Sequence, residues 1–546
     1  MFDRNHNPCG DDRRTAMSSN LATTTPARSA FKRLLRIAVI LGIVFAAAVG
    51  GVFYVAARNR PNIARNFAAE LNGPILAVPE DQRAWPIYRE ALVEVAVDEP
   101  AHWRANSDQA ERIVHVKEVI EYLDRQEPTL SRVRKAAKLP ALGYALADQT
   151  SPEDAILRLR RAPPGSMPPT VEPPSKNPWM FTIICNPCDQ TVELSRVLAG
   201  HALVSAKRGD TAAAVDDIEA MIGIAQQIRE VPFLVTDLAS LRQFRFALMH
   251  WGRLLEAVPD TFTTEQLLRL ERAAKAFGDG KQLVRIDGER LAFADTAQRF
   301  FTDDGHGDGR GCYSDIHDLG KPSTQSDFWK SFLQPKPASH SWSRRRNVEE
   351  AERQYTLLET ELARPYWQCD CEGFRRQLAQ VRQDPTLELV ALMLSSLPST
   401  HKSQQDAAQQ RDALLTASAL VRYRLNRKAW PERLETLVPQ YMAEIPPDQF
   451  TGKPLRYALI AGAPRIYSVG FDKQDDGGTA GEFTTDDRLA SEKQRWYLSF
   501  ARTPEETKGD LILWPTGPQV IPLDPEPPES ASQSPNSRPP TVSPDE

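Results

Sequence analysis

Several motifs that mark common enzyme classes are missing from this sequence. It has no P-loop, no GxGxxG dinucleotide fingerprint and no HExxH zinc motif, and its nine histidines form no recognisable Ser/His/Asp pattern. The sequence therefore gives no support for a nucleotide-dependent enzyme, a zinc protease of the HExxH type or a serine hydrolase. The sequence predicts a protein without evident catalytic activity.

The sequence also has no concentration of charge of one sign and few cysteines. The formal net charge is −5 over 546 residues, and no basic stripe stands out, so nucleic acid is not an expected partner. The six cysteines are too few for a dense disulfide scaffold. Hydrophobic residues make up 41% and charged residues 25%, which is typical of folded globular proteins.

One long apolar run stands out, from Ile37 to Ala57, and it contains no charged residue. A helix of about 21 residues is roughly 31 Å long, enough to cross the hydrocarbon core of a bilayer. Basic residues are slightly more frequent before the run than after it, which predicts a cytoplasmic N-terminus. Those before it are Arg28, Lys32, Arg33 and Arg36, and those after it are Arg58, Arg60 and Arg65.

Two alternatives stay open for this run: a buried core helix, and a signal peptide cleaved near Ala46–Ala48. The anchor is favoured because the apolar stretch continues to Arg58, further than a signal peptide needs. Met17 is an alternative start that leaves the reasoning unchanged. We therefore expect a single-pass protein of the bacterial inner membrane, with a basic cytoplasmic tail (1–36), a transmembrane helix (37–57) and an extracytoplasmic bulk.

Residues 58–398 show helical periodicity and few strand patterns, which predicts a mainly α fold. The clearest feature is a helical hairpin from Val192 to Arg229, whose turn Lys207–Asp210 offers Gly at the C′ position and Asp as an N-cap. This turn resembles that of a tetratricopeptide (TPR) unit, so the body is expected to be a helical bundle or short TPR-like solenoid. Further helices are predicted over Asp81–Val97, Val114–Leu123, Leu234–Ala257, Thr264–Ala276, Leu283–Phe301 and Asn347–Leu362.

Cys185 and Cys188 form a CxxC pair between the apolar run Met180–Ile184 and a predicted helix. A strand, CxxC and helix in this order is what a thioredoxin-like redox site needs, because the helix N-terminus lowers a thiol pKa. The βαβ surroundings of that fold are absent, so a structural disulfide or two ordinary thiols is the favoured interpretation. A four-thiolate zinc site with Cys369 and Cys371 is a weaker alternative, because the second pair has the wrong spacing.

An acidic, glycine-rich loop follows the helix predicted over 283–301. In an EF-hand-like arrangement Asp304, Asp308 and Asp315 would take calcium-ligand positions one, five and twelve, and Gly309 the tight-turn position. His306 is a poor calcium ligand, however, and Asp315 is shorter than the usual bidentate Glu. A surface turn with solvated carboxylates is the alternative.

Residues 403–515 carry a distinctive order of motifs. A helix from about Ala407 to Asn426 and a short helix at Pro431 lead into "IPPDQFTGKPLRY", then "IYSVGFD", and finally an apolar strand at Gly509–Trp514. This order resembles the globular head of the major pseudopilins of type II secretion. It also resembles the ending of membrane-anchored bacterial proteins of unknown function that carry it behind a helical body.

The resemblance implies a small α+β head with calcium held by the final loop. By matching position, the carboxylate ligands would be Asp472, Asp475, Asp476 and Asp510. Gln449 departs from the motif's usual proline, and a long insertion from Thr479 to Lys508 divides the loop. The apolar run also lacks a prepilin peptidase site and lies hundreds of residues from the head, so polymerisation as a pilin is not expected.

Residues 516–546 are rich in Pro and Ser and are predicted to be disordered. The leading hypothesis is thus a non-enzymatic, membrane-anchored extracytoplasmic interaction protein that binds an unidentified protein partner, with calcium as the candidate cofactor. Two alternatives are a component related to type II secretion and a thiol–disulfide enzyme that uses the CxxC pair.

Overall fold

The structure is a computed structural model, and it describes residues 36–51, 61–106, 110–160, 171–280, 282–311, 343–394, 400–470, 472–479 and 509–515. The chain divides into two compact units, Met1–Arg60 and Pro61–Glu546. Residues 36–51 of the first unit are helical. Residues 52–57 of the predicted membrane helix lie outside the described residues, as do the tail 516–546 and most of the basic tail. Among the helices described, none is both long and apolar enough to span a bilayer.

The second unit is mainly helical, as predicted. Its first part contains α2 (Phe67–Ala77), α3 (Trp85–Val95), α4 (Ala101–Asn106), α5 (Ala110–Ile113), α6 (Lys117–Arg125), α7 (Glu127–Ala136) and α8 (Ile156–Leu159). The longer helices follow: α9 (Asn186–Lys207), α10 (Thr211–Ile228), α11 (Leu234–Ala257), α12 (Thr264–Ala276), α13 (Asp287–Phe300), α15 (Arg344–Leu362), α16 (Cys371–Gln383), α17 (Glu388–Met393) and α18 (Thr400–Arg427). Short 3₁₀ turns join them: η1 (Glu80–Gln82), η3 (Met180–Thr182), η4 (Phe277–Gly280), η7 (Tyr366–Gln368), η8 (Pro385–Leu387) and η10 (Leu434–Leu437).

The predicted hairpin is α9 and α10, and its turn has the expected chemistry. Gly209 has a φ of +87°, a left-handed conformation that favours glycine after a helix end. The Asp210 side chain accepts a hydrogen bond from the Ala213 N–H at 3.0 Å and so caps α10. The prediction of two antiparallel helices around this turn is confirmed.

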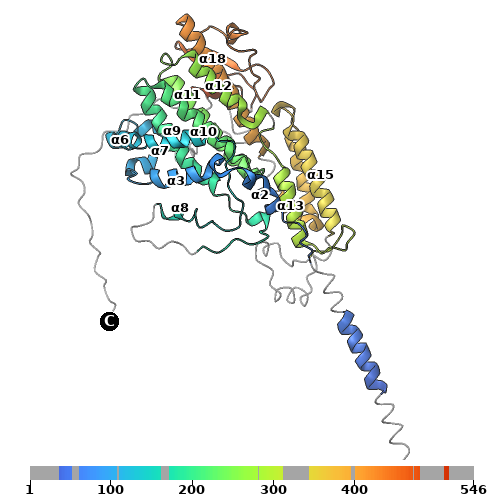
Figure 1. Ribbon diagram of the computed structural model, residues 1–546. Helices are drawn as coiled ribbons and strands as arrows, with labels where there is room; N and C mark the ends of the chain where they lie inside the picture. Colours follow the sequence, from blue (N-terminus) through green and yellow to red (C-terminus); the bar gives the residue numbers. More distant parts are fainter. Residues whose placement is uncertain are drawn as a thin grey trace, which may run out of the picture. The chain divides into compact units, whose positions relative to one another are not determined.

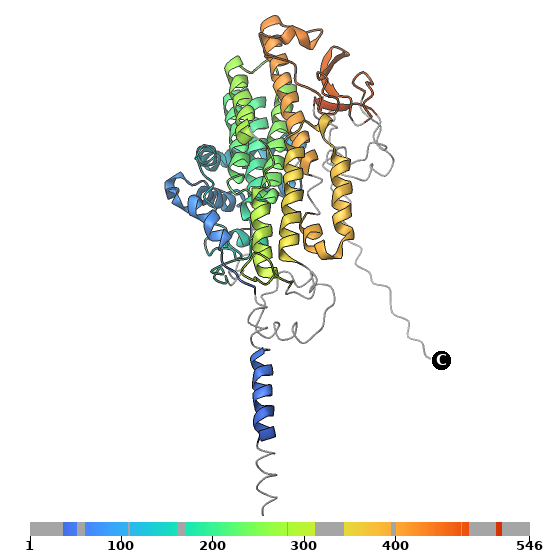
Figure 2. The same ribbon diagram turned by 90° about the vertical axis from the view of Figure 1, so that its right-hand side faces the viewer.

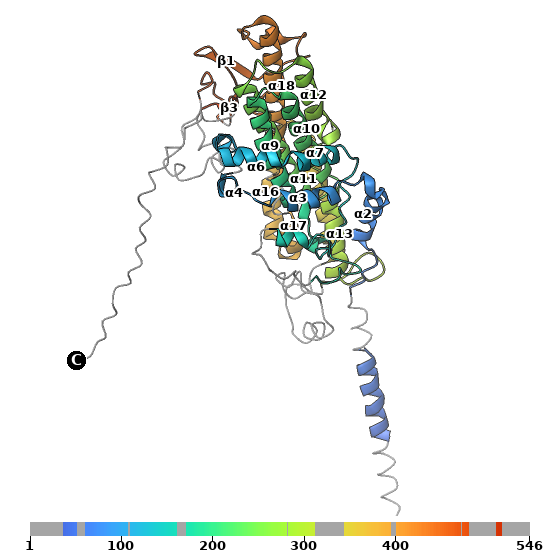
Figure 3. The same ribbon diagram turned by 60° about the vertical axis from the view of Figure 1, so that its left-hand side comes forward.

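The long helices lie side by side and form the centre of the second unit. In Figure 1, α9, α10 and α11 are neighbours, and α13 lies beside α15, in agreement with the contacts between these helices. Figure 3 shows the short helices α3, α6 and α7 lying across α9 and α10, and each of the three contacts at least one of these two helices. One continuous core of buried apolar side chains extends from Phe67 in α2 to Trp514 near the C-terminal end of the unit.

A small antiparallel sheet follows α18, as the motif order predicts. Its strands are β1 (Arg456–Ile460), β2 (Ala463–Ser468) and β3 (Leu511–Trp514), in the order β1-β2-β3. Figure 2 shows α18, in orange, running along the unit towards this sheet, in red. The short helix expected at Pro431 is present as the 3₁₀ helix η10, which begins three residues later, at Leu434.

The sheet packs on the helical bundle through α18 and α11. The Arg422 guanidinium in α18 pairs with Glu271 of α12 at 2.9 Å, and both side chains are buried. The Trp514 indole N–H in β3 donates to the Gly252 carbonyl of α11 at 3.2 Å. The ion pair fixes α18 to α12, α18 contacts β2 and β3, and the indole bond joins β3 directly to α11, so the sheet is held by the bundle rather than standing apart from it.

The apolar run Met180–Ile184 is not a strand, contrary to the arrangement considered for the CxxC pair. Three of its residues form η3, and only one bridge joins Ile184 to Ala147. The neighbouring strand that would extend this bridge into a ladder is missing among the described residues. Local β-propensity therefore does not produce a sheet here.

Candidate functional site

Cys185 and Cys188 lie at the N-terminus of α9. Cys185 is the N-cap residue, and Pro187 occupies the first turn, where its missing N–H costs no hydrogen bond. Cys188 follows in the same turn and is 5% exposed, whereas Cys185 is partly exposed. Both cysteines thus lie at the positive end of the helix dipole, and Cys188 is the more buried of the two.

The two thiols are close enough to interact directly. Their Sγ atoms are 2.9 Å apart. The hydrogen bond from Cys188 and the Cys188 backbone N–H lower the pKa of Cys185, although burial opposes them. The same thiol contact, together with burial, raises the pKa of Cys188 far above its usual range. One thiolate is therefore stabilised, and its partner stays protonated.

Polar groups around the pair fix the segment that carries it. The Tyr144 hydroxyl donates to the Ile184 carbonyl at 3.2 Å. The Gln243 side-chain amide of α11 donates to the Cys188 carbonyl at 3.4 Å. The arrangement has two features that nucleophilic thiol chemistry uses: a partly exposed thiol whose pKa is lowered, and a second sulfur within reach.

The other predicted cysteine partners give no metal site. Cys312 and the Cys371 side chain lie outside the described residues, and Cys369 is a partly exposed thiol. Within the described ranges, no three His, Cys, Asp or Glu side chains are grouped so that they could hold a metal ion.

The acidic turn at residues 303–309 uses its carboxylates to bind its own backbone. Asp304 accepts from the N–H groups of His306 (2.7 Å) and Asp308 (3.0 Å), which lower its pKa. Asp308 accepts from Gly309 N–H at 2.8 Å and from two groups at the start of α15. Asp315 lies outside the described residues. The two described carboxylates therefore complete a turn and cap α15.

The two halves of the C-terminal acidic loop lie next to each other. Asp472 accepts from the Gly509 N–H at 3.1 Å, across the insertion. Asp475 accepts from the Tyr467 hydroxyl at 3.0 Å and lies 3.5 Å from the Arg456 Nε. Asp476 is exposed.

Asp510 differs from these three carboxylates, because it is 3% exposed and only one of its two carboxylate oxygens accepts a hydrogen bond. Its Oδ2 accepts from the Gly478 N–H at 2.7 Å, but its Oδ1 is buried without a hydrogen-bond partner. Burial raises the pKa of Asp510, the backbone N–H groups of Gly478 and Asp476 oppose this, and the negative charges of Asp475 and Asp476 add to the rise. A buried carboxylate oxygen without a partner is costly unless a cation or proton compensates for it.

One further acidic residue, Asp448, was not among the predicted site residues. It is 1% exposed and accepts three hydrogen bonds, from Phe450 N–H (2.8 Å), Ser468 Oγ (3.0 Å) and Val469 N–H (3.0 Å). It therefore ties the turn before β1 to the end of β2. Its place in the string "PPDQF" was a usable signal, since a lone Asp between prolines and an aromatic residue is typical of a turn that binds its own backbone.

Comparison with known proteins identifies no relative for this chain. No family model, no curated protein and no solved structure matches it. The resemblance of residues 403–515 to a pseudopilin head stays a prediction.

Proposed function

We propose that this chain is a membrane-anchored extracytoplasmic protein whose Cys185–Cys188 pair exchanges between dithiol and disulfide with a partner protein. The observation that carries the proposal is the position of Cys185 as the N-cap of α9, with its Sγ 2.9 Å from that of Cys188. The uncharged apolar run at 37–57 supports the compartment. Disulfide chemistry suits an oxidising space outside the cytoplasm.

The exchange proceeds in two steps that balance. The Cys185 thiolate attacks a disulfide of the partner, forms a mixed disulfide and releases one partner thiolate, which takes up a proton. The Cys188 thiol then loses its proton and attacks the Cys185 sulfur, which releases the second partner thiolate. The partner gains two electrons, and Cys185 and Cys188 become a disulfide. Run in reverse, the same steps oxidise a partner dithiol.

Alkylation of the folded protein tests this proposal. We expect Cys185 to react with iodoacetamide well below the pH at which an ordinary thiol of pKa about 8.5 reacts, and Cys188→Ala to shift that reaction to higher pH because the hydrogen bond to the thiolate is lost. Cys369, a partly exposed thiol outside the pair, is the internal control. Reaction of Cys185 only after denaturation, or a permanent Cys185–Cys188 disulfide under mild reductant, would contradict the proposal.

A mixed disulfide provides a second readout. Cys188→Ala removes the resolving thiol, so partner proteins should stay covalently attached to Cys185 and appear as higher-mass species on a non-reducing gel. Cys185→Ala should trap none of them. Equal trapping by the two variants would contradict the assigned roles.

A second function is favoured by the buried Oδ1 of Asp510, which has no hydrogen-bond partner. In this function the chain is an interaction protein whose C-terminal part is stabilised by a calcium ion. The residues that would hold the ion are Asp510 and, by the resemblance to a pseudopilin head, Asp472, Asp475 and Asp476, whose carboxylates supply the oxygen ligands that calcium prefers. The described structure does not group three of these carboxylates closely enough to hold a metal ion, so binding requires them to move towards Asp510. The test is the melting temperature with calcium and with chelator. Calcium should raise it in the wild type and leave Asp510→Asn unchanged; an equal response of the two proteins would exclude this site.

A further inference from the structure

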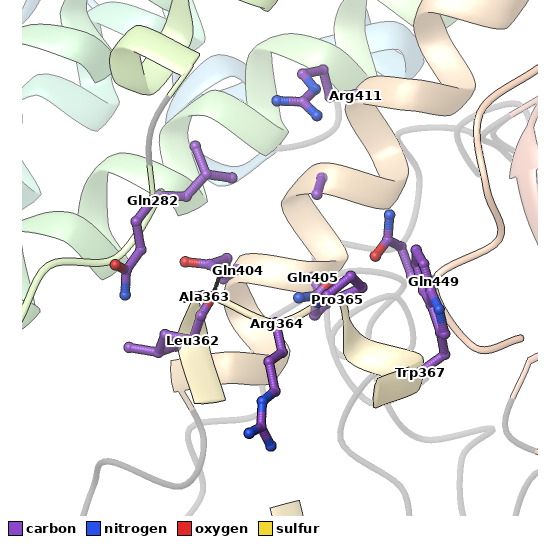
Figure 4. A pocket seen from close by; sticks show the side chains of 12 residues that line it. Gln282, Leu362, Ala363, Arg364, Pro365, Trp367, Gln404, Gln405, Arg411 and Gln449 are labelled. Carbon is purple, nitrogen blue, oxygen red and sulfur yellow. Dashed lines mark hydrogen bonds between the residues drawn. The ribbon is translucent and has the colours of Figure 1, made fainter. Parts of the chain in front are cut away.

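A cavity unrelated to the cysteine pair or the acidic loops lies where α15, α18 and the segment before β1 meet. It has a volume of about 480 Å³, within the range of small-molecule sites. Figure 4 shows Gln282 across the cavity from Gln449 and Trp367, with Arg411 and Arg364 at opposite ends. Segments far apart in sequence therefore build one recess.

The cavity is held open by hydrogen bonds between its walls. The Gln404 side chain in α18 accepts from Val284 N–H at 3.0 Å and donates to the Leu362 carbonyl at the end of α15 at 2.8 Å. The Gln449 N–H donates to the Gln409 side chain at 2.7 Å. These bonds join three chain segments to α18, so the recess is formed before any ligand arrives.

Two glutamine side chains line the cavity, and their amide groups make no hydrogen bonds in the described structure. Gln405 is 7% exposed and Gln449 is 8% exposed. Both line the recess, and the described structure gives neither side-chain amide a hydrogen bond. Gln282, opposite, has a buried Nε2 without a partner. A primary amide carries donors and an acceptor on adjacent atoms, so the three residues together match groups that donate and accept, as hydroxyls do.

The charged residues of the lining are both cationic. Arg364 donates to Glu361 at 2.7 Å through Nη1 alone, and Arg411 pairs with Asp412 at 3.0 Å. Neither carboxylate lines the cavity, and none of the lining residues is acidic. Guanidinium groups at two ends of a recess favour a ligand that carries carboxylates.

Trp367 adds a partly exposed aromatic surface, and its position is fixed by Gly452. A Cβ on Gly452, whose φ is +71°, would lie 2.6 Å from the Trp367 Nε1. Only glycine therefore lets the indole lie against this turn. An indole that borders a polar recess suits a ligand with both an apolar face and polar edges.

We propose that this cavity binds an acidic oligosaccharide, a sugar chain whose residues carry carboxylates. The amides of Gln282, Gln405 and Gln449 hydrogen-bond its hydroxyls, the guanidinium groups of Arg364 and Arg411 bind its carboxylates, and Trp367 covers the apolar face of one ring. A neutral sugar leaves the arginines unused, and a simple dicarboxylic acid leaves the amides unused. The proposal does not depend on either function proposed above.

Titration calorimetry on the full-length protein in detergent micelles tests the proposal with three probes: digalacturonate, the neutral disaccharide galactobiose, and glutarate. We expect digalacturonate to bind at least about tenfold more tightly than the other two, equivalent to about 1.4 kcal/mol. If galactobiose bound as tightly as digalacturonate, the arginines would have no role in binding. If glutarate bound as tightly as digalacturonate, the amides would have none. Either result, or no binding of digalacturonate, overturns the proposal.

Substitutions locate the binding. Arg364→Gln and Gln405→Leu should each weaken digalacturonate binding about tenfold. Arg353→Gln is the matched control, because Arg353 pairs with Glu350 three residues earlier, as Arg364 pairs with Glu361, but does not line the cavity. Its affinity should equal that of the wild type. Melting temperatures separate loss of binding from loss of fold, and unchanged binding in both cavity variants places the sugar elsewhere.

Discussion

The two acidic turns of this protein have similar compositions but different hydrogen bonding. In the turn at 303–309, Asp304 and Asp308 accept hydrogen bonds from backbone N–H groups and from the start of α15. In the C-terminal loop, Asp510 is just as firmly placed but keeps one buried oxygen without a partner. The hydrogen bonds that Asp304 and Asp308 accept reach the Oδ1 atoms of exposed or half-buried carboxylates, whereas the unused oxygen of Asp510 is buried.

This difference shows how to interpret clusters of Asp and Gly in a sequence. Both turns have the spacing of a calcium loop, because the same residues that bind calcium also cap turns and helices. What distinguishes them is whether a carboxylate oxygen without a hydrogen-bond partner is buried, as in Asp510, or open to solvent. Substitutions that remove a satisfied carboxylate should therefore act differently from one that removes an unsatisfied carboxylate.

The largest effect is expected at Asp448, whose carboxylate is fully used. Asp448→Ala leaves three donors without their acceptor, two of them backbone N–H groups, at a cost of about 1–3 kcal/mol for each one that stays buried. We expect the free energy of unfolding to fall by about 3 kcal/mol or more, equally with calcium and with chelator. Chemical denaturation measures it, and Asp476→Ala, at an exposed position in the same region, should change it little. A calcium-dependent loss would show that Asp448 belongs to the cation site.

A smaller loss is expected at Asp308. Asp308→Ala removes the acceptor for Ser343 Oγ and for Arg345 N–H at the start of α15. Loss of a helix cap costs about 1–2 kcal/mol, and calcium should not change this value. Thermal unfolding with calcium and with chelator measures this loss of stability. If calcium stabilises the wild type but not Asp308→Ala, the first turn is a metal site after all and the comparison fails.

The smallest effect concerns pH and Asp510. Its pKa is raised in the folded protein above the ordinary value of 3.8, so the protonated form is favoured by folding. This contribution is fully present below pH 3.8 and is lost as pH rises through the raised pKa. With chelator, the wild type should therefore gain stability relative to Asp510→Asn as pH falls towards 4. An identical pH dependence of the two proteins would mean that Asp510 is not strained at neutral pH.

Much of the helical fold could be predicted from local patterns. The bounds of α11 and α12 agree with the sequence-based ranges, because apolar residues recur at helical spacing. Gly209 and Asp210 directly mark the turn between α9 and α10. Local patterns failed where tertiary contacts decide. Residues 180–184 have strand propensity but no neighbouring strand among the described residues.

The candidate sites were predictable to unequal degrees. The cysteine pair was visible as a CxxC, but the 2.9 Å separation of its sulfur atoms and the N-cap position of Cys185 came only from the structure. The glutamine-lined cavity was missed, since Gln282 and Gln449 lie far from α18 in sequence. One indication was available: α18 carries Gln404, Gln405, Gln409 and Gln410, and all four are buried. Buried amides on a core helix need hydrogen-bond partners, so a cluster of them indicates either a polar contact between chain segments or a binding site.

The bond between Trp514 and Gly252 has a consequence for how the protein is made. Its two residues are 262 positions apart, so the ribosome must synthesise nearly the whole described chain before β3 can dock on α11. Until then, β2 presents an unpaired edge, which is prone to association with other strands. During synthesis, this incomplete sheet therefore leaves one strand edge open to association with other chains.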